Sequence, residues 1–434
     1  MNTNGLFVLI VDKIYPKTSR FIEKVRRLAD QRTELVVARV DGFGEGLDLA
    51  SACSPTPAPR IISGDLKELA RAIREITQGK ISIAALNEAA ILPGLALRKL
   101  LDVPGRPGLL EACDKRLTRS CLQKTSNRTD FATADPGAPP EPVFDAERFV
   151  VKPSFGASSK DVRFCCAWHQ VRDLVVGPTR TLTWVPQHVM EALGRPEVRT
   201  DGWIVEPYIE GTEFSIDGWR KGDQFRAIVQ HKLSMIEDGP FVGDGPTISP
   251  PAGPDELGPQ WRPLHTSEPA IAAFGRAVLD AIGFTHGAFH IEGRERASDG
   301  QLYLVEINPR APGGSLWRSA LARTGDDLEL VDAAIQLGLE VPPPIEARMP
   351  YVLHYPFYAS TPGKLTDWGD LDGPATANID TLSIDFAASL GQTFLPTDLN
   401  EEPYLAFAVA CDETRAGLFD KMDRILRLRP PTIS

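Results

Sequence analysis

The first part of the chain alternates between apolar runs and amphipathic stretches, and this alternation limits the folds open to it. Leu6–Val11 is a continuous apolar run, typical of a parallel strand that is covered on both faces. The same order of strand and helix signals then continues through Phe21–Asp30, Glu34–Val40, Leu66–Gln78 and Ile81–Leu86. Strands that alternate with helices predict βαβ units and a doubly wound sheet. No GxGxxG motif follows the first strand, so the dinucleotide fingerprint is missing.

Strand signals dominate the middle of the chain. The segments that we expect to form an antiparallel sheet there are Phe149–Lys152, Trp203–Ile209, Glu213–Trp219 and Phe225–Lys232. Gly239–Pro254 is rich in Gly and Pro without a period, so we expect a long loop. Ala270–Ile282 has the period of a helix, and the chain closes with a strand at Tyr404–Ala410 and a helix at Thr414–Leu428.

Composition excludes several classes of protein. Asp and Glu number 58 against 47 Lys and Arg, and this net charge of −11 argues against a nucleic-acid partner, which would need a basic footprint. The six cysteines include no CxxC pair, so neither a zinc ribbon nor a disulfide framework is expected. Reduced thiols fit a cytoplasmic protein. No apolar run is long enough for a membrane span, so we expect no membrane partner.

Two neighbouring strands carry the strongest candidate site. His286–Arg294 and Gln301–Pro309 predict a β-hairpin with a Ser-Asp-Gly turn around Asp299. A turn centred on Asp299 places Glu292 directly opposite Glu306. Two carboxylates in such positions repel each other, and a hard cation between them would remove the repulsion.

The second strand adds further polar groups on the same face. Glu306, Asn308 and Arg310 alternate along it, so their side chains point the same way. Carboxylates with an amide oxygen suit magnesium, which often shares its oxygen ligands with nucleotide phosphates. The alternative is a solvated pair of glutamates bound to nearby arginines. Apolar neighbours such as Leu304 and Ile307 argue against it, because they make both faces of the strand largely apolar.

Two lysines are candidates for phosphate binding. Lys152 ends an apolar run and precedes the Ser/Gly-rich turn Ser154–Ser159, which can place an ammonium group and backbone N–H groups around phosphates. GxxxxGK[ST] is absent, so this is not a P-loop. Lys115 opens a helical stretch and would, by itself, be an ordinary surface lysine.

In this order the segments resemble the ATP-grasp superfamily over nearly the whole chain. The resemblance is carried by Asp114-Lys115, Val151-Lys152-Pro153, the run Val205–Phe214, and Glu292 followed by Glu306-Ile307-Asn308-Pro309-Arg310. Among relatives, the chain looks most like the L-amino-acid ligases and the biotin carboxylase branch. The Gly313-Gly314-Ser315 turn fits the former.

The resemblance implies a multidomain chain of α/β and α+β class. A Rossmann-like N-terminal domain would occupy residues 1–110, and an ATP-grasp domain would occupy residues 111–345. Within the latter, residues 111–200 would form the smaller, lid-bearing part and residues 201–345 the metal and hinge part. Residues 346–434 would form a C-terminal α/β subdomain.

The family's roles carry over residue by residue. The positions implied to bind ATP are Lys115, Lys152, Ser158, Glu206, Tyr208, Ile209 and Glu213. Glu206 to Ile209 would form the hinge at the adenine, Glu213 would reach the ribose, and Ser154–Ser159 would be the lid over the phosphates.

The same resemblance assigns the metal and the catalytic cation. Glu292, Glu306 and Asn308 would hold one or two Mg²⁺ ions, for which Mn²⁺ could substitute. Arg310 would stabilise the acyl phosphate and the tetrahedral intermediate, together with backbone N–H groups near Gly313-Gly314.

The implied activity is ATP-dependent joining of a carboxylate to an amine, with amino acids as small-molecule substrates and a homodimer as the assembly that relatives often form. One alternative is a biotin carboxylase-like enzyme, because Gln230-His231-Lys232 faintly resembles a segment of that branch. A second is a regulator that binds nucleotide without turnover. A third is a zinc hydrolase built on His290 and Glu292, although no further His or Cys clusters nearby. His231, Met235 and Trp317 are candidates for the substrate pocket.

The metal assignment predicts the effect of one substitution. Glu306→Gln should remove most of the ATP-dependent activity and leave the fold intact, because the amide keeps the shape of the side chain and loses its charge. ADP release and circular dichroism of the purified variant measure the two effects. Near-normal turnover would refute the metal assignment.

Overall fold

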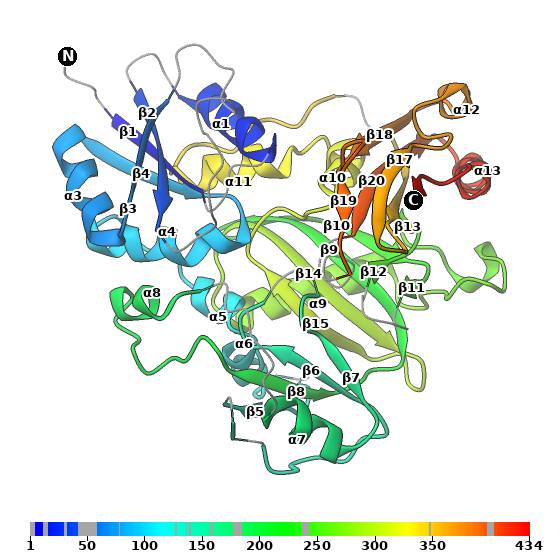
Figure 1. The fold of residues 1–434 in the computed structure, drawn as a ribbon, viewed down its shortest axis with the longest axis horizontal. Helices are drawn as coiled ribbons and strands as arrows, with labels where there is room; N and C mark the ends of the chain where they lie inside the picture. Colours follow the sequence, from blue (N-terminus) through cyan, green and yellow to red (C-terminus); the bar gives the residue numbers. More distant parts are fainter. Residues whose placement is uncertain are drawn as a thin grey trace.

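The computed structural model describes most of the chain. The described residues are 5–11, 16–29, 33–41, 59–77, 79–125, 128–135, 137–138, 140–156, 159–176, 185–236, 243–346, 349–396 and 403–434. An eight-stranded sheet lies between an N-terminal four-stranded sheet and a second four-stranded sheet from residues 132–207 (Figure 1). No helix in the described ranges combines the length and apolar character needed to cross a membrane.

The N-terminal sheet is parallel, with the strand order β3-β2-β1-β4. Its elements are β1 (Gly5–Val11), α1 (Pro16–Leu28), β2 (Thr33–Val40), β3 (Arg60–Gly64), α3 (Leu66–Ile76), β4 (Lys80–Ala85) and α4 (Glu88–Leu100). Even-numbered residues of β1 pack with α3 and α4, whereas odd-numbered ones pack with α1 and α11 (Leu328–Gln336). Both faces are therefore covered, as the apolar run predicted.

The second four-stranded sheet is antiparallel and has the order β5-β8-β6-β7. Its strands are β5 (Ala132–Ala134), β6 (Phe149–Pro153), β7 (Arg163–Cys165) and β8 (Trp203–Pro207). The helices of this region are α5 (Leu109–Cys113), α6 (Lys115–Leu122), α7 (Trp168–Val176) and α8 (Gln187–Ala192). The strand predicted for Trp203–Ile209 thus ends two residues early, at Pro207.

The eight-stranded sheet is antiparallel and has the order β15-β14-β9-β10-β13-β16-β20-β18. Its strands are β9 (Gly211–Lys221), β10 (Gln224–Lys232), β13 (Thr247–Ser249), β14 (His286–Arg296), β15 (Leu302–Asn308), β16 (Tyr351–Tyr358), β18 (Leu382–Phe386) and β20 (Tyr404–Asp412). Strands from both sides of residue 346 share this sheet, so the C-terminal segment continues it.

The remaining elements lie around this sheet. They are β11 (Met235–Ile236), β12 (Gly243–Asp244), the 3-10 helix η1 (Pro254–Glu256), α9 (Glu268–Ala281), α10 (Trp317–Thr324), β17 (Gly363–Asp367), α12 (Pro374–Ala377), β19 (Thr393–Phe394), α13 (Arg415–Leu426) and β21 (Thr432–Ile433). The helices predicted at 270–282 and 414–428 are therefore confirmed as α9 and α13.

The long loop predicted for Gly239–Pro254 is wrong in part. Thr247–Ser249 forms β13, a central strand that bridges β10 and β16, and Ile248 on it is fully buried. The strand was missed because it is only three residues long, between Pro246 and Pro250, which have no N–H to extend a ladder. Residues 239–242 of the predicted loop lie outside the described residues.

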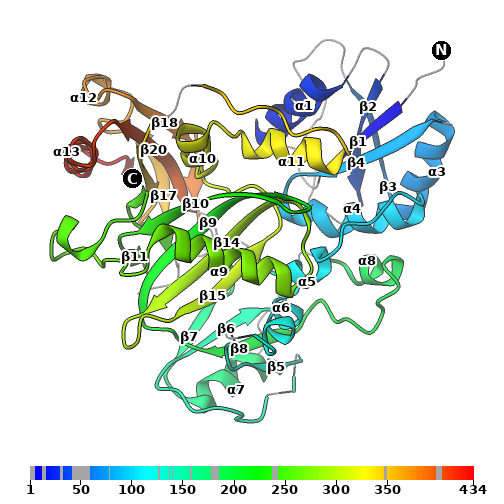
Figure 2. The same ribbon diagram turned by 180° about the vertical axis from the view of Figure 1, so that it is seen from behind.

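The two faces of the eight-stranded sheet differ in chemistry near β9 and β14. Helix α9 covers one face, as the reverse view shows (Figure 2), and packs there on Phe214, Ile216 and Ile291. Alternate residues point to the opposite face, because side chains in a strand alternate. Those residues are Glu213, Ser215 and Asp217 on β9, and His290 and Glu292 on β14.

The ladder between β14 and β15 contains a β-bulge between Glu292 and Gly293. Near the turn, Gly293 is paired with Leu304, and the next pair is Glu292 with Glu306, so Val305 is the extra residue. Without the bulge Glu292 would lie opposite Val305. The bulge therefore brings the two carboxylates opposite each other.

Gly293 at this bulge has no room for a side chain. A Cβ there would lie 2.5 Å from Cζ of Phe214 and 2.9 Å from the carbonyl oxygen of Tyr303. Gly293→Ala should lower the free energy of unfolding by about 1–3 kcal/mol, because the core must shift to admit the methyl group. Thermal melting measures the loss. Gly105→Ala is the control, since nothing lies within 4 Å of its added Cβ. Equal melting temperatures for both variants would contradict the packing at the bulge.

Candidate active site

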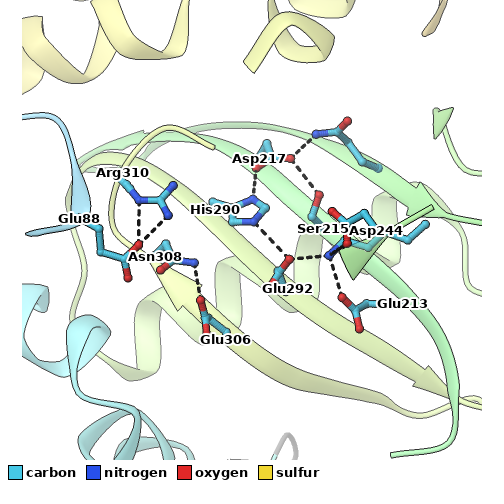
Figure 3. Close-up of polar contacts among 12 residues, drawn as sticks. Glu88, Glu213, Ser215, Asp217, Asp244, His290, Glu292, Glu306, Asn308 and Arg310 are labelled. Carbon is cyan, nitrogen blue, oxygen red and sulfur yellow. Dashed lines mark hydrogen bonds and ion pairs between the residues drawn. The ribbon is translucent and has the colours of Figure 1, made fainter. Parts of the chain in front are cut away.

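The structure confirms that Glu292 and Glu306 are directly opposite each other on β14 and β15. Their side chains belong to a row of polar groups on one face of β9, β14 and β15 (Figure 3). Glu306 accepts a hydrogen bond from Nδ2 of Asn308 at 2.9 Å. Nζ of Lys115 lies 3.2 Å from the other carboxylate oxygen of Glu306, so this glutamate has a cationic partner.

Lys115 is held by groups from two directions. Besides Glu306, its Nζ donates to the carbonyl oxygen of Gly156 at 2.9 Å, in the turn after β6. Burial lowers the pKa of Lys115, but the charges of Glu306 and Glu88 outweigh it, so the pKa is raised and the amine stays charged. Asp114 begins this helix by accepting from the backbone N–H of Arg116, which fixes where Lys115 starts α6.

Glu292 is balanced by a different lysine. Nζ of Lys232 on β10 lies 2.5 Å from Glu292, 2.7 Å from Glu213 and 2.9 Å from Asp244. Burial lowers the pKa of Lys232, but the three carboxylates raise it well above its usual value. These same carboxylates are close enough together to hold a metal ion. In this structure the lysine amine lies among them and supplies the positive charge.

His290 extends the row beyond Glu292. Its Nδ1 lies 2.5 Å from Asp217, and its Nε2 lies 3.4 Å from Glu292. Burial lowers the pKa of His290, but Asp217 and Glu292 raise it to about 10, so the ring is an imidazolium that donates from both nitrogens. Asp217 also accepts from Ser215 and Gln230. Because both ring nitrogens already face carboxylates, neither points to an open position for zinc, which argues against the zinc hydrolase.

Lys152 lies where the two sheets meet. Its Nζ is 2.9 Å from Glu206 on β8 and donates to the carbonyl oxygen of Val305 at 3.2 Å. Arg119 on α6 also pairs with Glu206 and donates to the carbonyls of both Leu304 and Val305, at 2.9 and 2.8 Å. Consecutive carbonyls of a regular strand point to opposite edges, so the bulge explains how one arginine reaches both.

Glu206 is a buried charge with two cations. Burial raises its pKa, but Arg119 and Lys152 outweigh that effect and lower it to about 2. Both carboxylate oxygens of Glu206 therefore have cationic partners within the protein. A role at the adenine would fall to the backbone of the hinge rather than to this side chain.

Two backbone groups of the predicted hinge already have partners. The N–H of Tyr208 donates to the carbonyl oxygen of Arg148 at 2.8 Å, and the carbonyl of Ile209 accepts from Arg294 at 3.2 Å. The guanidinium groups of Arg148 and Arg294 both contact the ring of Tyr208, at 4.3 and 4.9 Å from its centroid. Arg294 in turn donates to Glu213 at 2.8 Å, so Glu213 is held by Arg294 and Lys232 together.

Arg310 follows β15 and reaches the N-terminal domain. Its Nε and Nη2 donate to one oxygen of Glu88 at 3.1 and 2.6 Å, and Nη1 donates to the carbonyl of Ala311 at 3.0 Å. Glu88 opens α4 just after β4. Burial lowers the pKa of Arg310, but Glu88 and Glu306 raise it, so the guanidinium stays charged.

The remaining predicted residues lie elsewhere or outside the described part. Ser158 is outside the described residues, and so is Ala157 of the predicted lid. His231 is fully buried, with Nε2 on the carbonyl of Arg262 at 2.7 Å, so it is a packing residue. The ring of Trp317 lies 4.6 Å from Nζ of Lys24 and 5.0 Å from the guanidinium of Arg20.

The structure thus brings together Lys115, Lys152, Glu306, Asn308, Arg310 and Glu292 around one hairpin. It also adds residues that sequence reasoning missed, namely Glu88, Arg119, Asp217, Asp244 and Lys232 as a charge partner. Arg119 had a signal, because it lies one helical turn after Lys115 on α6 and so shares its face. Glu88 had a weaker one, as the first residue of a helix that follows a parallel strand.

The donor atoms at the hairpin fit magnesium. Glu292 and Glu306 supply carboxylate oxygens from facing positions, and Asn308 has an amide oxygen that its bond to Glu306 does not use. Hard cations prefer such oxygen ligands. The lysines that now balance the two glutamates show that the site carries negative charge for a cation to neutralise.

Family models and curated proteins give no match to the chain. Solved structures do match over its whole length. The L-amino acid ligase from Bacillus licheniformis matches with a TM-score of 0.71 at 17% identity, covering 100% of each chain. N5-carboxyaminoimidazole ribonucleotide synthetase from Thermotoga maritima matches with a TM-score of 0.61 at 14% identity, covering 99% of each chain.

A third match is the biotin carboxylase domain of 2-oxoglutarate carboxylase from Hydrogenobacter thermophilus, solved with MgADP, ADP and bicarbonate. Its TM-score is 0.59 at 12% identity, covering 100% of this chain and 92% of that one. These are ATP-grasp proteins, so the chain has the ATP-grasp fold that its motifs resembled. Such low identities show the fold, and the chemistry has to be argued from the side chains.

The buried charge of Glu206 predicts a pH-dependent contribution to stability. A carboxyl whose pKa falls from 4.5 to about 2 on folding stabilises the native state above its unfolded pKa, on the order of 3 kcal/mol, and this is lost as pH falls toward the folded value. Glu206→Gln should therefore be less stable than the wild type by a constant amount above about pH 5. The difference should shrink at lower pH.

Urea unfolding across this pH range measures the difference. Glu197→Gln is the control, because Glu197 is mostly solvent-exposed and its ion pair with Arg195 at the surface contributes little to stability. A difference that stays constant from neutral pH down to about pH 3 would show that the pKa of Glu206 is not lowered.

Proposed function

We propose that the chain is an ATP-dependent carboxylate–amine ligase that joins amino acids through an acyl phosphate and releases ADP and phosphate. The observation that carries this proposal is the meeting of Lys115 and Lys152 with the acidic hairpin and Arg310 in an ATP-grasp fold. Two cations and an oxygen-rich cation site at one place suit a polyphosphate. Arg310 beside them suits a reacting phosphoryl group.

In the proposed complex, Lys115 and Lys152 bind the ATP phosphates. Lys115 now pairs with Glu306, so phosphate would compete for its Nζ and leave the glutamate to a cation. Glu292, Glu306 and Asn308 would hold Mg²⁺, which offsets phosphate charge. The hinge of Tyr208 and Ile209 would contact the adenine, Glu213 would reach the ribose, and residues 154–159 would cover the phosphates.

The chemistry then needs two displacements. A carboxylate oxygen of the first substrate attacks the γ-phosphorus, the bond to the bridging oxygen breaks, and ADP leaves. The amine of the second substrate attacks the acyl carbon, forms a C–N bond, loses a proton, and expels inorganic phosphate. Arg310 would stabilise the charge that develops on the acyl oxygen, because a fixed guanidinium costs no reorganisation when the reaction occurs.

The charge pairs also support turnover over mere nucleotide binding. Lys115 and Arg310 are kept charged by Glu306 and Glu88, although all four side chains are largely buried. Burying charges is costly, so a binding module has little reason to hold an arginine in this position. The structural match to an L-amino acid ligase makes amino acids the first substrates to test.

ADP release by the purified protein tests the proposal. With MgATP and pairs of amino acids, ADP and phosphate should form in equal amounts, and mass spectrometry should find a product lighter by one water than the two substrates together. Glu306→Gln serves as the matched control, because it should abolish release under the same conditions.

Three other results would each reject the ligase. ADP that appears only with biotin and bicarbonate would indicate the carboxylase. Nucleotide affinity without phosphate release would indicate the regulator. Release that does not depend on any amino acid would indicate an ATPase.

A further inference from the structure

The turn after Arg310 has an unusual backbone. Gly314 and Ser315 are both left-handed, with φ of +56° and +65°. Glycine adopts this conformation freely, but Ser315 has a Cβ and does so only where the surrounding structure holds it. A Cβ at Gly313 would lie 4.0 Å from Nη1 of Arg310, so the turn is adjacent to the proposed catalytic arginine.

The C-terminal segment holds this turn through Asp385 on β18. One oxygen of Asp385 accepts from Oγ of Ser315 at 2.6 Å. The same carboxylate accepts two bonds from Arg318, at 2.6 and 2.5 Å, so Arg318 fixes its orientation. Figure 1 shows that β18 is the edge strand beyond β20, close to α10, which begins just after the turn.

A second contact comes from β16. Nε2 of His354 donates to the carbonyl oxygen of Gly314. Burial lowers the pKa of His354 to about 4, so the ring is neutral and keeps its proton on Nε2, where the carbonyl needs a donor. Phe407 on β20 stacks on His354 with centroids 5.5 Å apart, and its ring would lie 3.3 Å from a Cβ at Gly314.

These contacts leave one side of the turn open. Gly313 is exposed, and within the described part of the chain the backbone N–H groups of Gly313 and Gly314 donate to no carbonyl. Two N–H groups beside an arginine are suited to an oxygen that gains negative charge. The contacts to the turn come from Asp385, His354 and Phe407 in the C-terminal segment. They would fix the direction in which the N–H groups of Gly313 and Gly314 point.

We propose that Asp385 and His354 are positioning residues that hold the turn Gly313–Ser315 so that its N–H groups, with Arg310, receive the oxyanion formed when the amine attacks. This inference rests on the proposed function. It makes His354 on β16 and Asp385 on β18 contributors to the acyl-transfer site. Loss of the contacts that Asp385 and His354 make with the turn should slow the attack of the amine on the acyl phosphate and leave ATP binding unchanged.

The test compares amide formed per ADP released, with MgATP and a mixture of the standard L-amino acids. Asp385→Leu and His354→Phe should lower this ratio about ten-fold or more, because a small displacement of an oxyanion donor is costly, while the KM for ATP changes less than about two-fold. Asp385→Asn keeps an acceptor for Ser315 and should retain most of the coupling.

A second-site change separates positioning from general damage. Ser315→Gly removes the Cβ that makes the left-handed conformation unfavourable, so in the Asp385→Leu background it should restore part of the coupling. Asp367→Leu is the matched control. It removes another C-terminal carboxylate, whose partners among the described residues include Arg429 and the N–H of Gly369 rather than the turn, and should leave coupling unchanged.

Hydrogen exchange of the full-length protein with MgADP provides a readout that needs no substrate. Amides of residues 313–316 should exchange faster in Asp385→Leu and not in Asp367→Leu. If the wild type forms no amide, the proposed function fails, and faster exchange confined to the turn still supports the positioning role. Unchanged exchange, unchanged coupling in both variants, or equal loss in Asp367→Leu would overturn it.

Discussion

The arrangement of charged residues in this structure depends on two carboxylates that lie opposite each other in a hairpin. The bulge at Gly293 aligns Glu292 with Glu306, and facing carboxylates destabilise a ladder unless cations neutralise them. Each glutamate has its own cation, Lys232 for the first and Lys115 for the second. Lys232 comes from β10 of the same eight-stranded sheet, whereas Lys115 comes from the start of α6. The ion pair of Glu306 with Lys115 therefore links the eight-stranded sheet to the region of the antiparallel four-stranded sheet. The polar row is therefore both a cost of folding and the centre of the proposed site for a cation and phosphates.

Side chains alternate between the two faces of the eight-stranded sheet, so the apolar side chains that stabilise the fold lie on one face and the charged side chains of the proposed site lie on the other. One face near β9 and β14 packs on α9 through apolar side chains, and the other holds the charged groups. Contacts from beyond β9, β14 and β15 complete the arrangement: Glu88 at the start of α4 orients Arg310, and Asp385 on β18, at the opposite edge of the sheet, holds the turn that follows it. Arg310 and its turn are thus held by segments from both ends of the chain. The mutual placement of the three parts matters more to the proposed chemistry than any one of them.

Local patterns were sufficient to predict much of this arrangement. The buried parallel strand β1 and the hairpin follow from periodicity and turn chemistry, and the resemblance supplied the lysines and Arg310. The pair Glu292–Glu306 was predicted correctly, but it lies face to face because of a bulge that the turn alone does not imply. The bulge was not predicted, because the prediction assumed a single register along the whole hairpin. The register near the turn in fact differs by one residue from the register at Glu292 and Glu306. Asp244 was missed because it lies in a segment expected to be a loop, and Glu88 because only tertiary structure brings α4 to Arg310. Ion-pair partners that are distant in sequence leave no periodic signal, so they can be identified only from the three-dimensional structure.

Transfer of labelled oxygen tests the central claim most directly. If the hairpin and its cations serve to phosphorylate a carboxylate, amino acids labelled with ¹⁸O in their carboxyl groups should pass one labelled oxygen to the inorganic phosphate released in each turnover. The label reaches phosphate only when a carboxylate oxygen has bonded to the γ-phosphorus and the acyl carbon has then been attacked. Mass spectrometry of the phosphate is the measurement, and a singly labelled product is the predicted result. Phosphate that is released in step with amide formation but carries no ¹⁸O would contradict the account.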